Sequence, residues 1–130
     1  ALRQEVVEMR EKMRSSLGTP EIRRNEVFHI KHDDGGIVDI EFMMQYLMLA
    51  WSAEHPELTQ WSDNIRQMEE LGRAGVLPVE DTEKLREVYI TLRSTIHRRA
   101  LQNLNSQVEG SAFQEERDYI QSMWKKVMLE

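Results

Sequence analysis

The sequence predicts an all-α fold, a helical bundle of about five helices with one short strand. Apolar residues recur at helical spacing in five segments, and glycine or proline follows most of these segments, where helices end. Hydrophobic residues make up 40% of the chain and charged residues 31%, which is typical of a soluble, helix-rich protein. The length of 130 residues allows one domain with a moderate core.

The first helix is predicted over residues 2–17 from an apolar stripe at Leu2, Val6, Met9, Met13 and Leu17. Gly18-Thr19-Pro20 ends it, since glycine suits the position after a helix and proline cannot continue one. Residues 27–31 alternate weakly and are too few for a stable helix, so a strand is predicted there. A strand needs ladder partners, and we expect them in another chain or in a part of the protein outside this sequence.

Residues 37–53 are apolar on nearly every side, so they are predicted to form the central and most buried helix. His55-Pro56 closes this helix, because proline pushes the preceding residue out of the helical conformation. Thr59 or Ser62 is expected to cap a third helix, which ends near Gly72 and Gly75.

The remaining helices follow the connector at Leu77-Pro78. The clearest helical stripe of the chain predicts the fourth, with apolar residues at Leu85, Val88, Tyr89, Leu92, Ile96, Ala100 and Leu104. Residues 103–110 are predicted to be a loop. Ser111 and Gln114 resemble a capping box at the start of the last helix. The eight methionines and three tryptophans are expected in the core, with a methionine-rich exposed groove as the alternative.

Composition excludes several classes of function. The formal net charge of -6 argues against nucleic-acid binding, and the basic pairs Arg23-Arg24 and Arg98-Arg99 are expected to be solvated. No apolar run approaches the roughly 20 residues needed to span a bilayer, so no membrane contact is expected. The absence of cysteine removes disulfides and thiolate zinc sites and fits a cytoplasmic location. The four histidines are scattered, so no metal site is expected.

The segment from residue 28 to residue 42 carries the most chemical information. Gly35 and Gly36 allow positive φ and a close approach to a neighbouring surface. Asp39 and Glu41 follow in the first turns of the central helix and point to different faces, so they are unsuited to hold one ion together. Each acid either faces a nucleotide or only complements the helix dipole. Lys31 either reaches a phosphate or only flanks the strand.

This segment closely resembles one protein family. The runs are Phe28-His29-Ile30-Lys31 and Asp39-Ile40-Glu41-Phe42, continuing into Gln45-Tyr46-Leu47, with further likeness at residues 5–14 and 58–64. They are similar to the C-terminal region of the bacterial glutamine synthetase adenylyltransferases. The resemblance implies a linker helix and strand over residues 1–35, adjoining the sheet of a nucleotidyltransferase domain outside this sequence. Residues 36–130 are then a C-terminal helical domain.

The resemblance also implies a function. The full-length enzyme transfers AMP from ATP to a tyrosine of glutamine synthetase with Mg²⁺, controlling nitrogen assimilation, and another half removes the AMP by phosphorolysis. A trimeric nitrogen-signalling regulator protein and the transferase domain of the same full-length chain are the implied partners, besides glutamine synthetase itself. Lys31, Gly35, Gly36, Asp39 and Glu41 are the residues expected to face the active site.

The family's catalytic motif is a Gly-Ser pair followed by two aspartates. Gly110-Ser111 is the only Gly-Ser pair, and no aspartates follow it directly. No catalytic or metal-binding residue is therefore expected in this chain, and the chain by itself is expected to be inactive. A regulatory interaction module and the equivalent domain of a related uridylyltransferase are the alternatives.

Overall fold

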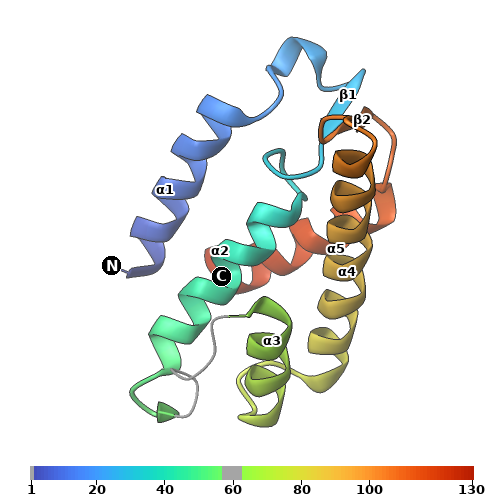
Figure 1. Ribbon diagram of the computed structural model, residues 1–130. Coiled ribbons are helices and arrows are strands. Elements are labelled where there is room, and N and C mark those ends of the chain that lie inside the picture. The colour runs from blue at the N-terminus through green and yellow to red at the C-terminus, as the bar shows by residue number, and fades with distance from the viewer. Residues whose placement is uncertain (1, 57–62) are drawn as a thin grey trace.

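The computed structural model describes residues 2–56 and 63–130. Its five α-helices are α1 (Leu2–Leu17), α2 (Ile37–Trp51), α3 (Asn64–Arg73), α4 (Val79–Leu101) and α5 (Gln114–Trp124), as Figure 1 shows. The π-helix η3 (Lys125–Leu129) continues α5, and the short 3₁₀ helix η1 (Glu21–Arg23) follows α1. The two strands are β1 (Val27–His29) and β2 (Gln107–Glu109). The prediction of a mostly helical domain is confirmed.

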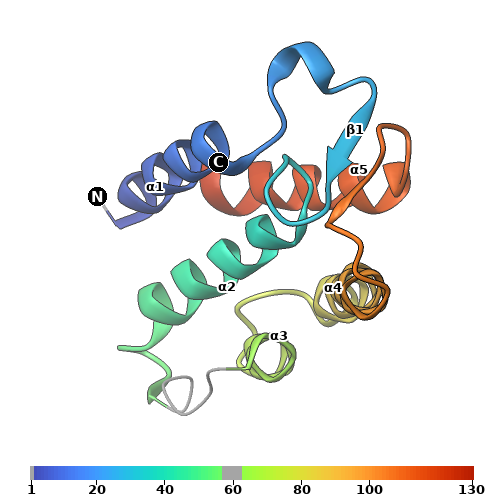
Figure 2. The ribbon, with the colours of Figure 1, turned by 45° about the horizontal axis from the view of Figure 1, so that its top comes forward.

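Helix α2 is the centre of the domain, as predicted. It contacts α1, α3, α4 and α5, and in Figure 2 it lies between α1 with α5 on one side and α3 with α4 on the other. Ile40, Met43 and Met44 are fully buried in it. The expectation that the methionines lie in the core holds for six of the eight, Met43, Met44, Met48, Met68, Met123 and Met128, whereas Met9 is exposed. Met13, Trp51 and Trp124 are partly buried against the core, and Trp61 lies outside the described residues. None of the helices in the described ranges is long and apolar enough to cross a membrane.

Helix α1 forms where the sequence predicts it but turns a different face inward. Val6, Val7 and Arg10 are its buried residues, whereas Met9 and Leu17 of the predicted stripe are 59% and 51% exposed. Arg10 can be buried because its charge is paired with a carboxylate inside the protein, and the packed face of α1 therefore includes this arginine. The spacing of apolar residues in the sequence does not reveal such a pair.

The expectation that β1 finds its ladder partner elsewhere is wrong. Strand β1 pairs antiparallel with β2 of the same chain, with Phe28 opposite Val108. The Ile30 amide donates to the Ser106 carbonyl at 2.8 Å and the Gly110 amide to the Glu26 carbonyl at 3.0 Å, which extends the ladder at both ends. Residues 103–110 are therefore not simply a loop, because residues 107–109 of this segment form the strand that pairs with β1. The partner lies far along the chain, and three residues are too few to show a strand period.

Two predicted helix caps differ from the structure. Asp63 caps α3, its side chain accepting from the amides of Ile65 and Arg66, while Thr59 and Ser62 lie outside the described residues. Ser111 does not cap α5. Phe113 occupies that position in the left-handed conformation, at φ 57°, without a side-chain hydrogen bond to the helix.

Two histidines lie close together where β1 leads into the turn toward α2, since His29 ends the strand and His32 lies in the turn. The rings of His29 and His32 meet edge to face, with centroids 4.8 Å apart. Nδ1 of His29 accepts from the amides of Lys31 and His32 at 3.3 and 3.4 Å. Desolvation lowers the pKa of both histidines, and the carboxylate of Asp33 opposes this change at each of them. The folded turn therefore favours neutral imidazoles.

The Leu47→Ala substitution should lower the free energy of unfolding by about 2–5 kcal/mol, because Leu47 is 5% exposed and truncation leaves a cavity in the core. Leu49→Ala is the matched control on the same helix, since Leu49 is 55% exposed. Chemical denaturation measures both changes. Equal losses in the two variants would contradict the placement of α2.

Stability should fall as the pH is lowered from about 7.5 to about 5.5. The unfolded histidines bind protons near their ordinary pKa of about 6.5, whereas the folded ones resist protonation, so acid favours the unfolded chain. The thermal midpoint at the two pH values measures this loss. The fall should be smaller in the His29→Gln/His32→Gln variant and unchanged in the control His97→Gln. A midpoint that does not move in the unmodified chain would contradict the assignment.

Candidate functional site

The glycine pair is a close contact inside the domain. Gly35 has a φ of +80°, which favours glycine, and a Cβ there would lie 2.9 Å from Cα of Arg117 on α5. A Cβ on Gly36 would lie 2.5 Å from the carbonyl oxygen of Ile30. The predicted positive φ and close approach are confirmed at Gly35. The surface approached is α5 of this chain, so the pair is needed for packing within the domain.

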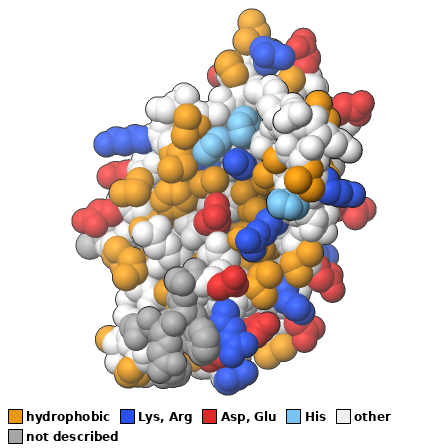
Figure 3. Space-filling view, viewed as in Figure 1, with side chains coloured by type: hydrophobic (Ala, Val, Ile, Leu, Met, Phe, Trp, Pro, Cys, Tyr) orange, Lys and Arg blue, Asp and Glu red, His pale blue; other side chains and the backbone are white. Residues whose placement is uncertain are grey.

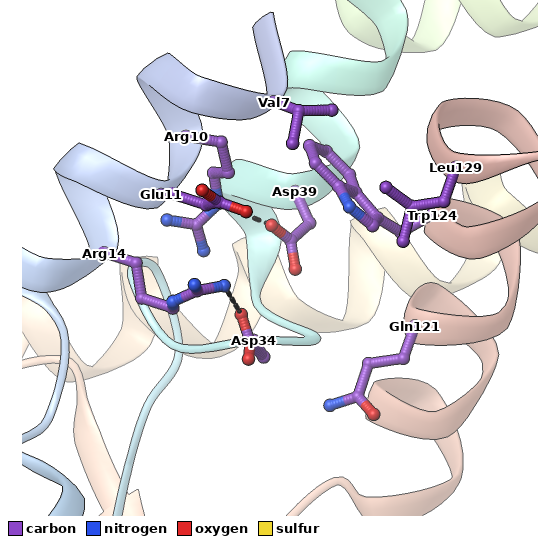
Figure 4. Close-up of a pocket in the computed structure, with 9 residues that line it drawn as sticks. All are labelled: Val7, Arg10, Glu11, Arg14, Asp34, Asp39, Gln121, Trp124 and Leu129. Atoms are coloured by element: carbon purple, nitrogen blue, oxygen red, sulfur yellow. Dashed lines mark hydrogen bonds and ion pairs between the residues drawn. The ribbon is translucent and has the colours of Figure 1, made fainter. Parts of the chain in front are cut away.

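Asp39 lies at the start of α2 and forms a buried ion pair with Arg10 of α1 (Figure 4). The Arg10 Nε donates to Oδ1 of Asp39 at 2.5 Å, and the Gly35 amide donates to Oδ2 at 2.8 Å. The two side chains are 1% and 6% exposed. Desolvation raises the pKa of Asp39, although the Arg10 guanidinium and the Gly35 amide act in the opposite direction. Asp39 thus faces α1 and the turn, where it holds these segments together.

A second buried carboxylate, that of Asp33, organises the turn itself. Its Oδ1 accepts from the Thr19 amide at 2.6 Å and its Oδ2 from the His29 amide at 2.7 Å. These bonds fasten the segment after α1 to the end of β1. Aspartate suits such a turn because its carboxylate accepts hydrogen bonds from nearby backbone amides.

A hollow of about 270 Å³ lies between α1 and α5, beside this ion pair. Figure 4 draws the residues that line it. Arg14 points across it toward Asp34, and their Nη1 and Oδ1 atoms lie 2.6 Å apart. Gln121 and Trp124 form the wall on the α5 side. This is a mixed hollow, with an indole and several charged groups within reach of one small molecule.

Lys31 and Glu41 lie on the surface, unlike the other predicted site residues. Both are exposed, and Lys31 and Arg93 of α4 lie near enough to Glu41 to act on its carboxylate. Desolvation raises the pKa of Glu41, and the two cations oppose that change. Figure 3 shows the face over α2 and α4, where hydrophobic side chains gather with a few charged ones of both signs among them. Asp39 and Glu41 therefore point to different faces, as predicted.

Arg10, Arg14 and Gln121 are the site residues that the sequence does not reveal. Arg10 and Arg14 occupy polar positions between apolar ones, which usually means an exposed helix face. Their spacing of four places them on one side of α1, the only signal that they act together. Within residues 2–56 and 63–130, no group of three or more histidine, aspartate or glutamate side chains could hold a metal ion.

The sequence model of the family described as GlnD PII-uridylyltransferase matches residues 5–123 of the chain. Similar curated proteins include one from Hahella chejuensis, 50% identical over 99% of this chain, and one from Pseudomonas aeruginosa, 47% identical over 99%. A third, from Acinetobacter baylyi, is 41% identical over 98%. All three are named bifunctional glutamine synthetase adenylyltransferase/adenylyl-removing enzyme.

The chain spans 14% of the length of each of these three relatives. The resemblance noted for residues 28–42 is confirmed, and it extends to nearly the whole sequence. The chain therefore belongs to the GlnD PII-uridylyltransferase family, and it matches one region of the larger glutamine synthetase adenylyltransferases.

Proposed function

We propose that this chain is the C-terminal helical part of an enzyme that transfers AMP from ATP to a tyrosine of glutamine synthetase, thereby controlling nitrogen assimilation. In the same proposal, another half of the full-length protein removes the AMP by phosphorolysis. The observation that carries the proposal is the identity of 41–50% to proteins of that name over nearly the whole chain. Because the chain spans 14% of their length, the activity belongs to the longer protein. Cytoplasm, with its ATP, is the compartment that fits this reaction.

Mg²⁺ and ATP are the cofactors of the proposed full-length enzyme, but the described residues do not fit them. They contain no candidate cluster of metal ligands. Gly110-Ser111 leads into Ala112 and Phe113 rather than into a pair of aspartates. We therefore place the metal and the triphosphate on the transferase domain of the full-length chain. The 130-residue chain alone should transfer no AMP.

The helical part would then act as a rigid support for that transferase domain. Gly35, Gly36 and Asp39 are buried, and their contacts lie within this chain, which suits a role in shaping the turn. Lys31 and Glu41 are exposed close to that turn, so they remain the candidates for facing the nucleotide-binding domain. Their opposite charges suit polar contacts with a neighbouring domain.

A second candidate function is regulatory. The matching family model is described as a PII-uridylyltransferase, whereas the similar curated proteins are named adenylyltransferases. This difference favours a domain that is shared by enzymes with different nucleotide donors. Such a domain would bind a trimeric nitrogen-signalling protein and switch the enzyme rather than take part in transfer. The two candidate functions predict different results when Lys31 and Glu41 are substituted.

Lys31→Gln and Glu41→Gln, made in the full-length protein, should each lower kcat/KM for AMP transfer about tenfold or more, because a displaced domain misaligns the reacting groups. The thermal midpoint should stay unchanged, since both side chains are exposed. Glu87→Gln is the control, because Glu87 is an exposed residue of α4, and it should leave AMP transfer unchanged. Unchanged transfer with a lost response to the signalling protein would favour the regulatory function. If neither AMP transfer nor the response to the signalling protein changed, both proposed roles of Lys31 and Glu41 would be contradicted.

The Asp39→Asn substitution should lower the free energy of unfolding of the 130-residue chain by about 3–5 kcal/mol, since it leaves the Arg10 guanidinium buried without a counter-charge. Asp34→Asn is the matched control. It breaks a partly exposed pair and should cost less than about 1 kcal/mol. Urea denaturation measures both variants. A mild effect of Asp39→Asn on stability combined with lost AMP transfer in the full-length protein would instead assign Asp39 to catalysis.

A further inference from the structure

A second hollow, of about 160 Å³, adjoins the one in Figure 4 and shares Arg14, Asp34 and Gln121 with it. Its other polar lining residues are Asp33, Arg24 and Arg117. Three arginines thus line one small space, from α1, from the segment before β1 and from α5. The formal charge of this lining is positive, three cations against two anions, although the chain as a whole carries -6.

The two acids at this hollow are already engaged. Both carboxylate oxygens of Asp33 accept backbone amides, from Thr19 and from His29. Asp34 accepts from Arg14 at 2.6 Å. These bonds partly offset the negative charge of the two carboxylates. Of the three arginines only Arg14 forms an ion pair within the part of the chain that the structure describes.

The arginines, in contrast, have donors to spare. Each guanidinium carries five N–H donors. Arg24 uses Nε for a long bond of 3.4 Å to the Thr19 carbonyl. Arg117 uses Nη1 for the Gly110 carbonyl at 2.5 Å and, at 3.4 Å, that of Ala112.

The Nε of Arg117 is buried and has no hydrogen-bond partner within the described part of the chain. Its guanidinium also lies over the Phe28 ring, 4.0 Å from the centroid, which fixes its plane. An unpaired buried donor costs free energy that a suitable acceptor would recover.

We propose that this hollow, defined by Arg14, Arg24 and Arg117, binds a phosphate group. A tetrahedral dianion presents several acceptor oxygens to guanidinium donors that come from different directions. The space of about 160 Å³ exceeds the ~30 Å³ that one water molecule occupies in the liquid, so it admits a group of several heavy atoms. This inference rests on the chain's own geometry and stands independently of the proposed enzymatic function.

Inorganic phosphate titrated into the 130-residue chain at about pH 7.5, where the dianion predominates, tests the proposal at constant ionic strength. The NMR signals of the Nε–H groups of Arg24 and Arg117 should shift and saturate, with a Kd at or below about 1 mM. Arg24→Gln should weaken binding about tenfold or more, since it removes a charged donor. Arg23→Gln is the matched control, because Arg23 is equally exposed but does not line the hollow, and this variant should bind phosphate as the unmodified chain does.

Gln121→Glu provides a second variant, which adds a negative charge to the hollow without removing an arginine and should also weaken binding. Amide spectra of each variant show that its fold is intact. AMP that displaces phosphate would assign the hollow to a nucleotide's phosphate, and AMP that does not would leave the free ion as the ligand. No saturation up to about 10 mM phosphate, or equal weakening by Arg23→Gln, would overturn the proposal.

Discussion

The buried guanidinium of Arg10 is the interaction on which the arrangement of the domain depends. Its Nε binds Asp39 at the start of α2, and its Nη2 donates to the carbonyls of His32 at 2.9 Å and Asp33 at 3.3 Å. One side chain thus joins α1, the turn after β1 and the first turn of α2. A charge so deeply buried is tolerated only with such partners, so the three segments are constrained to meet in one geometry.

This constraint changes how the segment at residues 28–42 is understood. Glycines and carboxylates at close spacing suggest a surface that faces an active site, yet here Gly35, Gly36, Asp33 and Asp39 make contacts inside the chain. They build a short, tightly bonded turn between a strand and the central helix. A segment with this much internal bonding would be rigid, which is the property that a support for a neighbouring catalytic domain requires.

The polar groups around this turn divide into two kinds. The inner ones, Arg10, Asp33 and Asp39, are buried and bonded to groups of this chain, so their role is cohesion, although Nη1 of Arg10 has no hydrogen-bond partner among the described residues. The outer groups are Lys31 and Glu41 on one side and the arginine-lined hollow on the other, and these keep charge available for other molecules. The proposals for a domain contact and for a phosphate site both use this outer layer, at different positions around one rigid centre.

Local patterns in the sequence were sufficient for the helices. Residues 37–53 are so apolar that only a central helix could bury them, and the glycine and proline signals separate the helices because those residues act on their own backbone. The hydrogen bonding of the turn by Asp33 also follows from the local sequence, because aspartate side chains accept hydrogen bonds from nearby backbone amides.

The tertiary structure alone decided the contacts between distant residues. The pairing of Phe28 with Val108, the burial of Arg10 against Asp39 and the convergence of Arg14, Arg24 and Arg117 join residues that the chain order separates. An arginine between apolar residues gives no sign of its partner, and a three-residue strand has no period to detect. The face of α1 that packs, and the assignment of Asp39 to cohesion, therefore became visible only when the segments were placed against one another, because burial and charge pairing are properties of the assembled core.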